Sequence, residues 1–430
     1  MFDLEQSLVL FGIMIVCILL SVPIGISLGI ATGLCLFLFS DISFLMIAQR
    51  AATALDSFPL LAIPFFILAG SLMSAGGIAR RIINLADTLI GFVTGGLGMV
   101  TVLSTMFYSA LSGSGPATVS AIGSFMIPAM KEKNYDAPFA AAITAAAGTM
   151  GVIIPPSIPF VIYCVVAQVS VGDLFIGGII PGIIIGISLM IVCWITSKKR
   201  GYVGTSTRPT LASVSKAFRE AILAIMVPVI ILGGIYSGVF TPTEAAVVAV
   251  VYSLIVGKFV YRELSCKDIY NCLRSSILIN GALLFMIGLS MSFATFLALN
   301  QIPTALANWI SGISDNKYVI LLIINVVLLI IGSSIDNISA TIIMTPILLP
   351  VVTNLGVDPI HFGLIITMNL ACGFLTPPYG INVFVASAIS GESIERISWA
   401  VLPSFCALVV CLMLFTYFPI FTMGLINLLR

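Results

Sequence analysis

The feature that most constrains this chain is a succession of apolar runs that continues along its whole length. Residues 7–39, 58–73, 174–196 and 318–332 are examples, and a helix needs roughly 20 apolar residues to cross a lipid bilayer. Only 8% of the 430 residues are charged, whereas a soluble domain carries about 25%. The longest polar stretch, 197–220, is too short to fold by itself. We therefore expect an all-α membrane protein that crosses the lipid bilayer many times.

Composition also narrows the function. The net charge of +1 gives no bulk attraction to nucleic acid, and the chain has no GxxxxGK[ST] loop for ATP hydrolysis. The nine cysteines form no CxxC pair, which favours small buried side chains over metal or redox chemistry, so no cofactor is expected. Asp3 and Glu5 precede the first apolar run in place of a basic leader. That run is therefore predicted to be a span and not a cleaved signal peptide.

The apolar runs fall into two series. The first contains segments 7–20, 23–39, 58–75, 89–130, 138–169 and 174–196. The second contains segments 220–237, 243–261, 275–299, 318–353, 359–388 and 399–427. In each series, glycine and proline interrupt the fourth and fifth segments, which are therefore predicted to be broken or folded back rather than plain spans.

The distribution of lysine and arginine predicts the orientation. We assume that each fourth segment returns to the side it left and that each fifth segment crosses once. Of the lysines and arginines, 15 then share one face, and only Arg50, Lys317 and Arg430 fall on the other. Because positive charge concentrates on the cytoplasmic side, that face is predicted to be cytoplasmic and both termini periplasmic. The charges do not distinguish a re-entrant hairpin from two full spans.

The two series are related by a repeat. Landmark residues recur at an offset of 219 in the earlier part of each series and 222 in the later part. The pairs include Pro23 with Pro242, Gly113-Ser114 with Gly332-Ser333, Asp136 with Asp358, Gly151 with Gly373, and Pro155-Pro156 with Pro377-Pro378. Each half crosses the membrane an odd number of times, so the second enters with opposite orientation. Such inverted repeats are typical of secondary transporters with a site near the midplane.

The fourth segments are predicted to be re-entrant hairpins. A straight helix over 89–130 would be about 60 Å long, twice the hydrocarbon thickness. Its middle contains glycines that permit a tight turn, followed by a proline suited to a new first turn. The two turns read Ser112-Gly113-Ser114-Gly115-Pro116 and Gly332-Ser333-Ser334-Ile335-Asp336-Asn337. The first hairpin is expected to enter from the cytoplasm and the second from outside.

The fifth segments are predicted to be broken spans. Their breaks read Gly151-Val152-Ile153-Ile154-Pro155-Pro156-Ser157 and Gly373-Phe374-Leu375-Thr376-Pro377-Pro378-Tyr379. Consecutive prolines leave carbonyl groups without helical partners, and these must face protein or a polar cavity within the membrane. A monovalent cation suits such carbonyls, and the N-termini of the half-helices suit an anionic group. The alternative is that the prolines merely kink packed helices.

Few acidic side chains lie deep in apolar segments. For Asp336 two roles stay open, cation ligation and N-capping of the following half-helix. Glu244 is predicted to close a capping box with Thr241. Asp136 and Asp358 are predicted to mark helix starts. The one histidine, His361, is predicted to pack near the external end of a span rather than relay protons.

Over essentially its whole length the chain resembles the large membrane subunit of the tripartite ATP-independent periplasmic (TRAP) transporters. The stretches that carry the resemblance are 112–118, 151–157, 238–246 and 375–378. The resemblance implies an inverted-repeat elevator fold of the ion transporter superfamily. Scaffold helices would occupy 1–88 and 220–317, moving transport parts 89–196 and 318–430, and a cytoplasmic linker 197–219.

The resemblance also implies a mechanism and partners. Sodium would drive uptake of an organic-acid substrate, of sialic acid or C4-dicarboxylate type, across the bacterial inner membrane. A soluble periplasmic binding protein would deliver the substrate. A small membrane subunit of about four spans would enlarge the scaffold, and we expect it to be a separate chain, because this sequence begins at the first large-subunit span.

Candidate site residues follow from the same resemblance. Sodium site 1 would comprise Ser112, Gly113, Ser114, Gly115, Gly151 and Pro155. Sodium site 2 would comprise Ser333, Ser334, Asp336, Asn337, Gly373 and Thr376. The substrate region between the tips would include Ser114, Pro156, Ser157, Ser334, Pro378 and Tyr379.

Three other functions remain as alternatives. A stand-alone sodium–carboxylate symporter of the same superfamily would work without a binding protein. An intramembrane enzyme is disfavoured, because such enzymes cluster acids, histidines or Ser-Lys pairs within spans. A channel is disfavoured because paired inverted hairpins suit alternating access better than a continuous pore.

Overall fold

The computed structural model describes residues 4–20, 22–40, 42–204, 208–302, 305, 316–377 and 380–429. Every regular element in these ranges is helical, as the apolar runs predicted. Seven helical stretches among them are long and apolar enough to cross a membrane. The chain is therefore an all-α, multi-pass membrane protein.

The described residues of the first half form ten α-helices. They are α1 (Leu4–Leu19), α2 (Ile24–Phe39), α3 (Leu45–Leu55), α4 (Ala62–Ala75), α5 (Ile78–Ile90), α6 (Gly96–Ser112), α7 (Gly115–Glu132), α8 (Ala137–Gly148), α9 (Ile158–Ala167) and α10 (Val171–Arg200). Short 3-10 turns precede α4 at Phe58–Leu61 and follow α8 at Thr149–Val152.

The described part of the second half has a matching order. Its helices are α11 (Leu211–Tyr236), α12 (Pro242–Ile255), α13 (Cys266–Leu299), α15 (Lys317–Gly332), α16 (Asn337–Asn354), α17 (Pro359–Gly373), α18 (Ile381–Ser390), α19 (Ile394–Tyr417) and α20 (Ile420–Leu429). A π-helical turn, Val256–Val260, follows α12.

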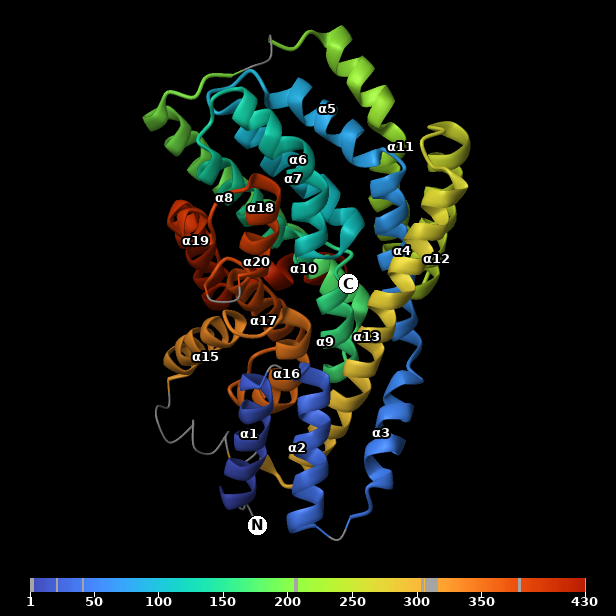
Figure 1. Cartoon of the computed structure of the whole chain (residues 1–430), viewed down its shortest axis with the longest axis vertical. Helices are drawn as coiled ribbons and strands as arrows, with labels where there is room; N and C mark the ends of the chain where they lie inside the picture. The colour runs from blue at the N-terminus through green and yellow to red at the C-terminus, as the bar shows by residue number, and fades with distance from the viewer. Residues whose placement is uncertain are drawn as a thin grey trace.

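The helices form two groups that lie side by side (Figure 1). In one, α4 packs on α12 and α13, and α13 also packs on α2 and α3. In the other, α6, α7 and α8 pack together with α18 and α19, while α10 packs on α6 and α19, and α17 packs on α10 and α19. The two groups meet where α4 touches α6 and where α13 touches α16. Helices α9, α15 and α16 pack on α17 and belong to the second group, which therefore contains all four interrupted segments.

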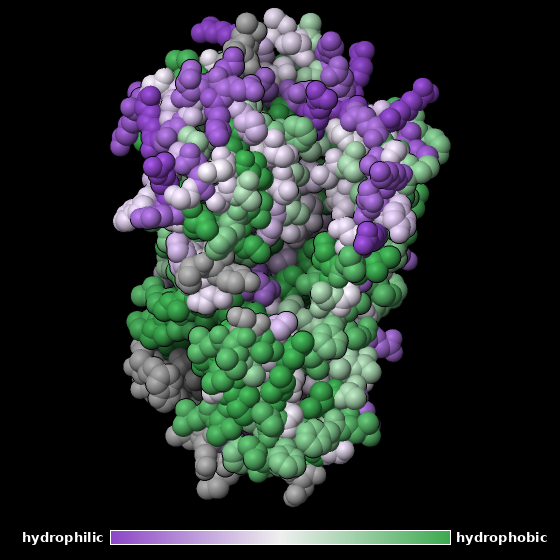
Figure 2. Space-filling model, viewed as in Figure 1, coloured by the Kyte–Doolittle hydropathy of each residue, from purple (hydrophilic) through white to green (hydrophobic). Residues whose placement is uncertain are grey.

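Hydrophilic side chains gather at one end of the molecule, and most of the remaining visible surface is apolar (Figure 2). This polar end is where α10 finishes with Lys198, Lys199 and Arg200 and where α11 begins (Figure 1). Leu211, Phe259 and Trp399 are among the many large apolar side chains left exposed. A surface of this kind is stable only against lipid or another apolar partner.

Several parts of the fold differ from the expected segments. Residues 45–55, which were assigned to no segment, form the helix α3, and α11 begins at Leu211, within the expected linker 197–219. The final segment, 399–427, is two helices and not one, because Phe418 leaves the helical conformation before Pro419, which has no N–H to donate. An amphipathic helix, α5, precedes the first hairpin. Its Arg81 bonds Glu263 at 2.7 Å and stacks 3.6 Å from the centre of the Tyr261 ring.

Candidate functional site

The first hairpin turns between α6 and α7. Gly113 has φ of +62°, a left-handed conformation that ends α6 and that glycine adopts without strain. Ser114 is extended, and α7 begins at Gly115 with Pro116 in its first turn. The two helices pack against each other along their length. The turn lies where the sequence predicted it.

This tip touches the first break. A β-carbon added at Gly151 would lie 2.6 Å from the carbonyl oxygen of Ser114, so only glycine fits there. Thr118 donates its hydroxyl to the same carbonyl at 2.8 Å and shares a second hydrogen bond with the Ser112 hydroxyl. The N–H of Ile158 donates to the carbonyl of Gly113 at 3.3 Å. The tip and both sides of the break thus meet around a cluster of oxygen atoms.

The second tip has a related arrangement. A β-carbon at Gly373 would collide with the carbonyl group of Gly332, so break and tip again meet backbone to backbone. Asn337, fully buried, donates its side-chain N–H to the Thr367 carbonyl at 3.4 Å. Thr376 donates its hydroxyl to the carbonyl of Cys372 at 3.3 Å, on the last turn of α17. Both tips therefore approach the break that the repeat assigned to them.

The two hairpins are nevertheless packed differently. Helices α6 and α7 pack closely, whereas α15 packs mainly on α17 and α16 mainly on α9, α13 and α17. The second turn is also longer, since Ser333 to Asp336 separate α15 from α16. The inverted repeat is therefore approximate at this pair of helices.

Asp336 caps a helix and also lines a cavity. Its carboxylate accepts the N–H of Ser339 at 3.0 Å, which confirms the N-cap.

Glu244 closes the capping box with Thr241, and Asp358 caps α17. Asp136 stands at the start of α8 but bonds Arg200 at 2.7 Å instead of capping. His361 is buried, with its Nδ1 2.7 Å from the Thr422 hydroxyl, so it joins α17 to α20.

A cavity of about 810 Å³ lies between the two hairpin tips and the group that contains α4 and α13. From the predicted sites, its walls include Ser112, Gly113, Ser114, Gly115, Asp336 and Asn337. It continues along α7 past Ser120 and Ser124 and along the first turns of α13 past Asn271 and Ser275. The hollow is visible in Figure 2 below the polar end. Among its described lining residues, Asp336 carries the only charged side chain.

Among the described residues, the other predicted site residues are not part of the lining of this cavity. Pro155 is buried, and the carbonyl of Pro156 lies beside Gly113. Ser157 is fully buried as the N-cap of α9, and its hydroxyl donates to the Val152 carbonyl at 2.6 Å. Ser333 and Ser334 donate their hydroxyls to the carbonyl of Ile330. Pro378 and Tyr379 fall outside the described residues.

Two residues at the first tip were not among the candidates. Thr118 lies one turn after Ser114 and belongs to the same distinctive stretch, so the sequence contained its signal. Asn382, at the start of α18, is fully buried beside Gly115. No local pattern points to Asn382, because its partner on α8, Ala145, is 237 residues away in the sequence.

Comparison with known proteins decides the family. The model of the family described as "Tripartite ATP-independent periplasmic transporter, DctM component" matches residues 11–421. The C4-dicarboxylate TRAP transporter large permease protein DctM of Pseudomonas aeruginosa is 41% identical over 93% of this chain and 94% of that protein. The chain belongs to the DctM family of TRAP transporters. The resemblance noted in the sequence is thereby confirmed.

Other members of the DctM family differ in named substrate and in length. The sialic acid TRAP transporter large permease protein SiaM of Vibrio cholerae is 38% identical over 93% of this chain and 94% of that protein. The isethionate TRAP transporter permease protein DctMQ of Oleidesulfovibrio alaskensis is 47% identical over 96% of this chain. This chain spans only 65% of the length of that relative.

The fold of this DctM family member is also similar to that of a solved transporter. The structure of the Alcanivorax borkumensis YdaH transporter matches with a TM-score of 0.63 at 15% identity, covering 88% of each chain. At this identity the likeness concerns the fold alone.

Proposed function

We propose that this DctM family member mediates sodium-coupled uptake of an organic anion by an elevator movement of its interrupted segments. The observation that carries the proposal is the pair of tip-to-break contacts, Gly151 against Ser114 and Gly373 against Gly332. Each contact brings together oxygen atoms that a hard monovalent cation prefers, without a cluster of carboxylates. Sodium would bind at both.

The substrate would bind between the tips, in the cavity of about 810 Å³. Helices α7 and α16 begin at its wall, at Gly115 and Asn337, and helix N-termini stabilise anionic groups. C4-dicarboxylates and sialic acid remain the substrate types we propose. Because a relative with 47% identity is named for isethionate, we add small sulfonates to these substrate types.

The cavity extends toward the polar end that we assign to the cytoplasm. Its lining continues from Gly115 to Ser124 on one side and along Ser275 and Asn271 on the other. We propose that this conformation releases substrate inward. Movement of the group containing α6–α10 and α15–α20 against α4 and α13 would carry the site to the outer side.

Transport would need two further proteins. We propose that a periplasmic binding protein delivers the substrate and that a small membrane subunit covers part of the apolar surface of the α1–α4 and α11–α13 group. Several of the exposed large apolar side chains belong to this group, including Phe37, Leu38 and Ile277.

Reconstitution tests the proposal. The chain, a small subunit and a binding protein are placed in proteoliposomes, and uptake of labelled C4-dicarboxylate, sialic acid and isethionate is measured. At least one substrate should accumulate only with an inward sodium gradient and only with the binding protein. Equal uptake with potassium replacing sodium would contradict sodium coupling.

The same reconstituted components separate the alternative functions. Saturable sodium-dependent uptake without any binding protein would favour the stand-alone symporter. Sustained single-channel currents in planar bilayers would favour a channel. Chemical conversion of the labelled substrate inside the vesicles would favour an intramembrane enzyme.

A further inference from the structure

Asn382 is a fully buried side chain of the second repeat that touches the first. It lies in the first turn of α18, where its backbone N–H donates to the Phe374 carbonyl at 3.2 Å, across the second break. Its side-chain N–H donates to the carbonyl of Ala145 on α8 at 3.1 Å. Its side-chain oxygen faces Gly115, at which an added β-carbon would lie 3.2 Å from it. One residue therefore contacts the second break, the last turns of α8 before the first break, and the first tip.

The carbonyl of Ala145 needs this donor because α8 tightens at its end. In a regular α-helix, the N–H of Thr149 would donate to it. Here the N–H of Thr149 donates to the carbonyls of Ala146 and Ala147 instead. A buried carbonyl without a partner is costly, and Asn382 supplies the missing hydrogen bond. The first break is thus completed by a side chain from the second repeat.

The other half of the Asn382 amide is unsatisfied. Its oxygen is buried and has no hydrogen-bond partner. It faces the first residue of α7, one residue after the Ser114 carbonyl that meets Gly151. If a bound cation displaced this tip, the contact between Gly115 and the Asn382 side-chain oxygen would therefore change directly.

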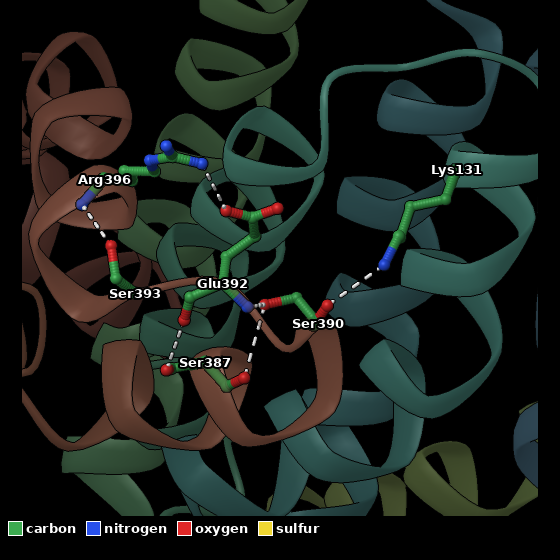
Figure 3. Close-up of polar contacts among 6 residues, drawn as sticks. All are labelled: Lys131, Ser387, Ser390, Glu392, Ser393 and Arg396. Carbon is green, nitrogen blue, oxygen red and sulfur yellow. Dashed lines mark hydrogen bonds and ion pairs between the residues drawn. The ribbon is translucent and has the colours of Figure 1, made fainter.

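The far end of α18 is also attached to the first hairpin. Lys131, at the end of α7, donates to the carbonyl of Ser390 at 3.0 Å (Figure 3). The loop after Ser390 is closed by the Ser387 hydroxyl, which donates to the Glu392 carbonyl at 2.6 Å (Figure 3). Helix α18 therefore contacts α7 at both of its ends and should follow any movement of the first hairpin.

We infer that Asn382 is a positioning residue that couples the first sodium site to the second break. The inference rests on the proposed sodium-coupled function. Cation binding at the first tip fixes Gly115, Gly115 fixes the Asn382 amide, and the amide fixes the start of α18. Phe374 and Gly380, which flank the second break, are then held in the geometry that the second site requires. By thermodynamic linkage, sodium bound at the second site raises the affinity of the first site by the same factor as sodium at the first site raises that of the second.

Sodium itself is a sufficient probe. The full chain, purified with its small subunit, is unfolded by heat at increasing sodium chloride, with choline chloride holding ionic strength constant. Ligand binding to the folded state raises the unfolding temperature. In Asn382→Leu, which keeps the branched shape of the side chain but is larger and has no polar atoms, the sodium concentration giving half-maximal stabilisation should rise about tenfold or more. The Hill coefficient should fall toward unity.

A matched control separates positioning from general stability. Asn325 is another fully buried asparagine of the second repeat, bonded to the Thr416 hydroxyl at 3.0 Å and to Asn369. Asn325→Leu should lower the unfolding temperature without sodium but leave the half-maximal sodium concentration unchanged. If Asn382→Leu does not fold, Asn382→Ser should show the same sodium shift, because serine cannot reach Ala145.

The outcomes are distinct. A half-maximal sodium concentration in the Asn382 variants within about twofold of the unsubstituted protein, with the Hill coefficient retained, would overturn the inference alone. An unsubstituted protein that sodium stabilises no more than choline would refute the proposed sodium function itself.

Discussion

At the scale of single residues, the candidate sodium sites depend on glycines that allow backbone segments to touch. Gly151 lies against the Ser114 carbonyl and Gly373 against the Gly332 carbonyl. The pairing was predictable, because the repeat placed each break at the same distance from its own tip. The surroundings of Asn382 were not, since they depend on how α18 of one repeat packs on α7 and α8 of the other.

Gly151→Ala should disturb the first site, since the new methyl group would overlap the Ser114 carbonyl and the Thr118 hydroxyl. Overpacking of this kind lowers the free energy of unfolding by about 1–3 kcal/mol. The additional stabilisation that sodium gives should fall by at least the same amount. Gly281→Ala is the control, because open space surrounds Gly281 and alanine there should stabilise α13 by about 0.5–1 kcal/mol. Thermal unfolding at several sodium concentrations measures both. A sodium response unchanged in Gly151→Ala would place the cation elsewhere.

Asp336→Asn separates the two roles of Asp336. Asparagine caps helices as well as aspartate does, so the free energy of unfolding without sodium should change by less than about 0.5 kcal/mol. Loss of the charge should weaken sodium binding roughly tenfold, equivalent to about 1.4 kcal/mol. Sodium-dependent uptake in proteoliposomes reports the second effect. Unchanged sodium dependence would leave Asp336 as a helix cap only.

At the scale of elements, the unequal packing of the two hairpins is the main departure from repeat symmetry. The glycines and prolines of the sequence predicted both turns and both breaks. They could not predict that α15 would pack mainly on α17 and only slightly on α16, because that packing depends on the apolar faces of other helices. The amphipathic helix α5 was missed because residues 78–90 include Arg80, Arg81 and Asp87 and do not form an apolar run.

Lys131→Met should loosen α18, because the Ser390 carbonyl would lose its charged donor. The bond lies near the surface, so its loss should cost about 1 kcal/mol. Hydrogen exchange of residues 381–390 should accelerate several-fold. Lys133→Met removes an exposed charge two residues away, for which the structure shows no hydrogen bond or ion pair, and exchange should stay unchanged. Equal exchange in the two variants would contradict the attachment of α18 to α7.

At the scale of the whole molecule, one end is polar and most of the remaining visible surface is apolar (Figure 2). The two ends of α11 test the orientation, since Ser215 and Ser237 are both exposed and lie at opposite ends of this helix. In a variant whose accessible native cysteines are replaced, a membrane-impermeant thiol reagent should label Ser237→Cys in spheroplasts. It should label Ser215→Cys only in inverted vesicles. The reverse pattern would place the polar end outside the cell.

The charge of the cavity has a consequence for the direction of net transport. In this conformation its described lining offers an anion no positive side chain and one carboxylate, Asp336. Under the proposed sodium coupling, sodium would leave for a cytoplasm where it is scarce, and the vacated cavity would then repel the substrate it had just released. Accumulated product should therefore inhibit the carrier weakly from the inside. Uptake could continue against a steep substrate gradient, with the return step occurring empty.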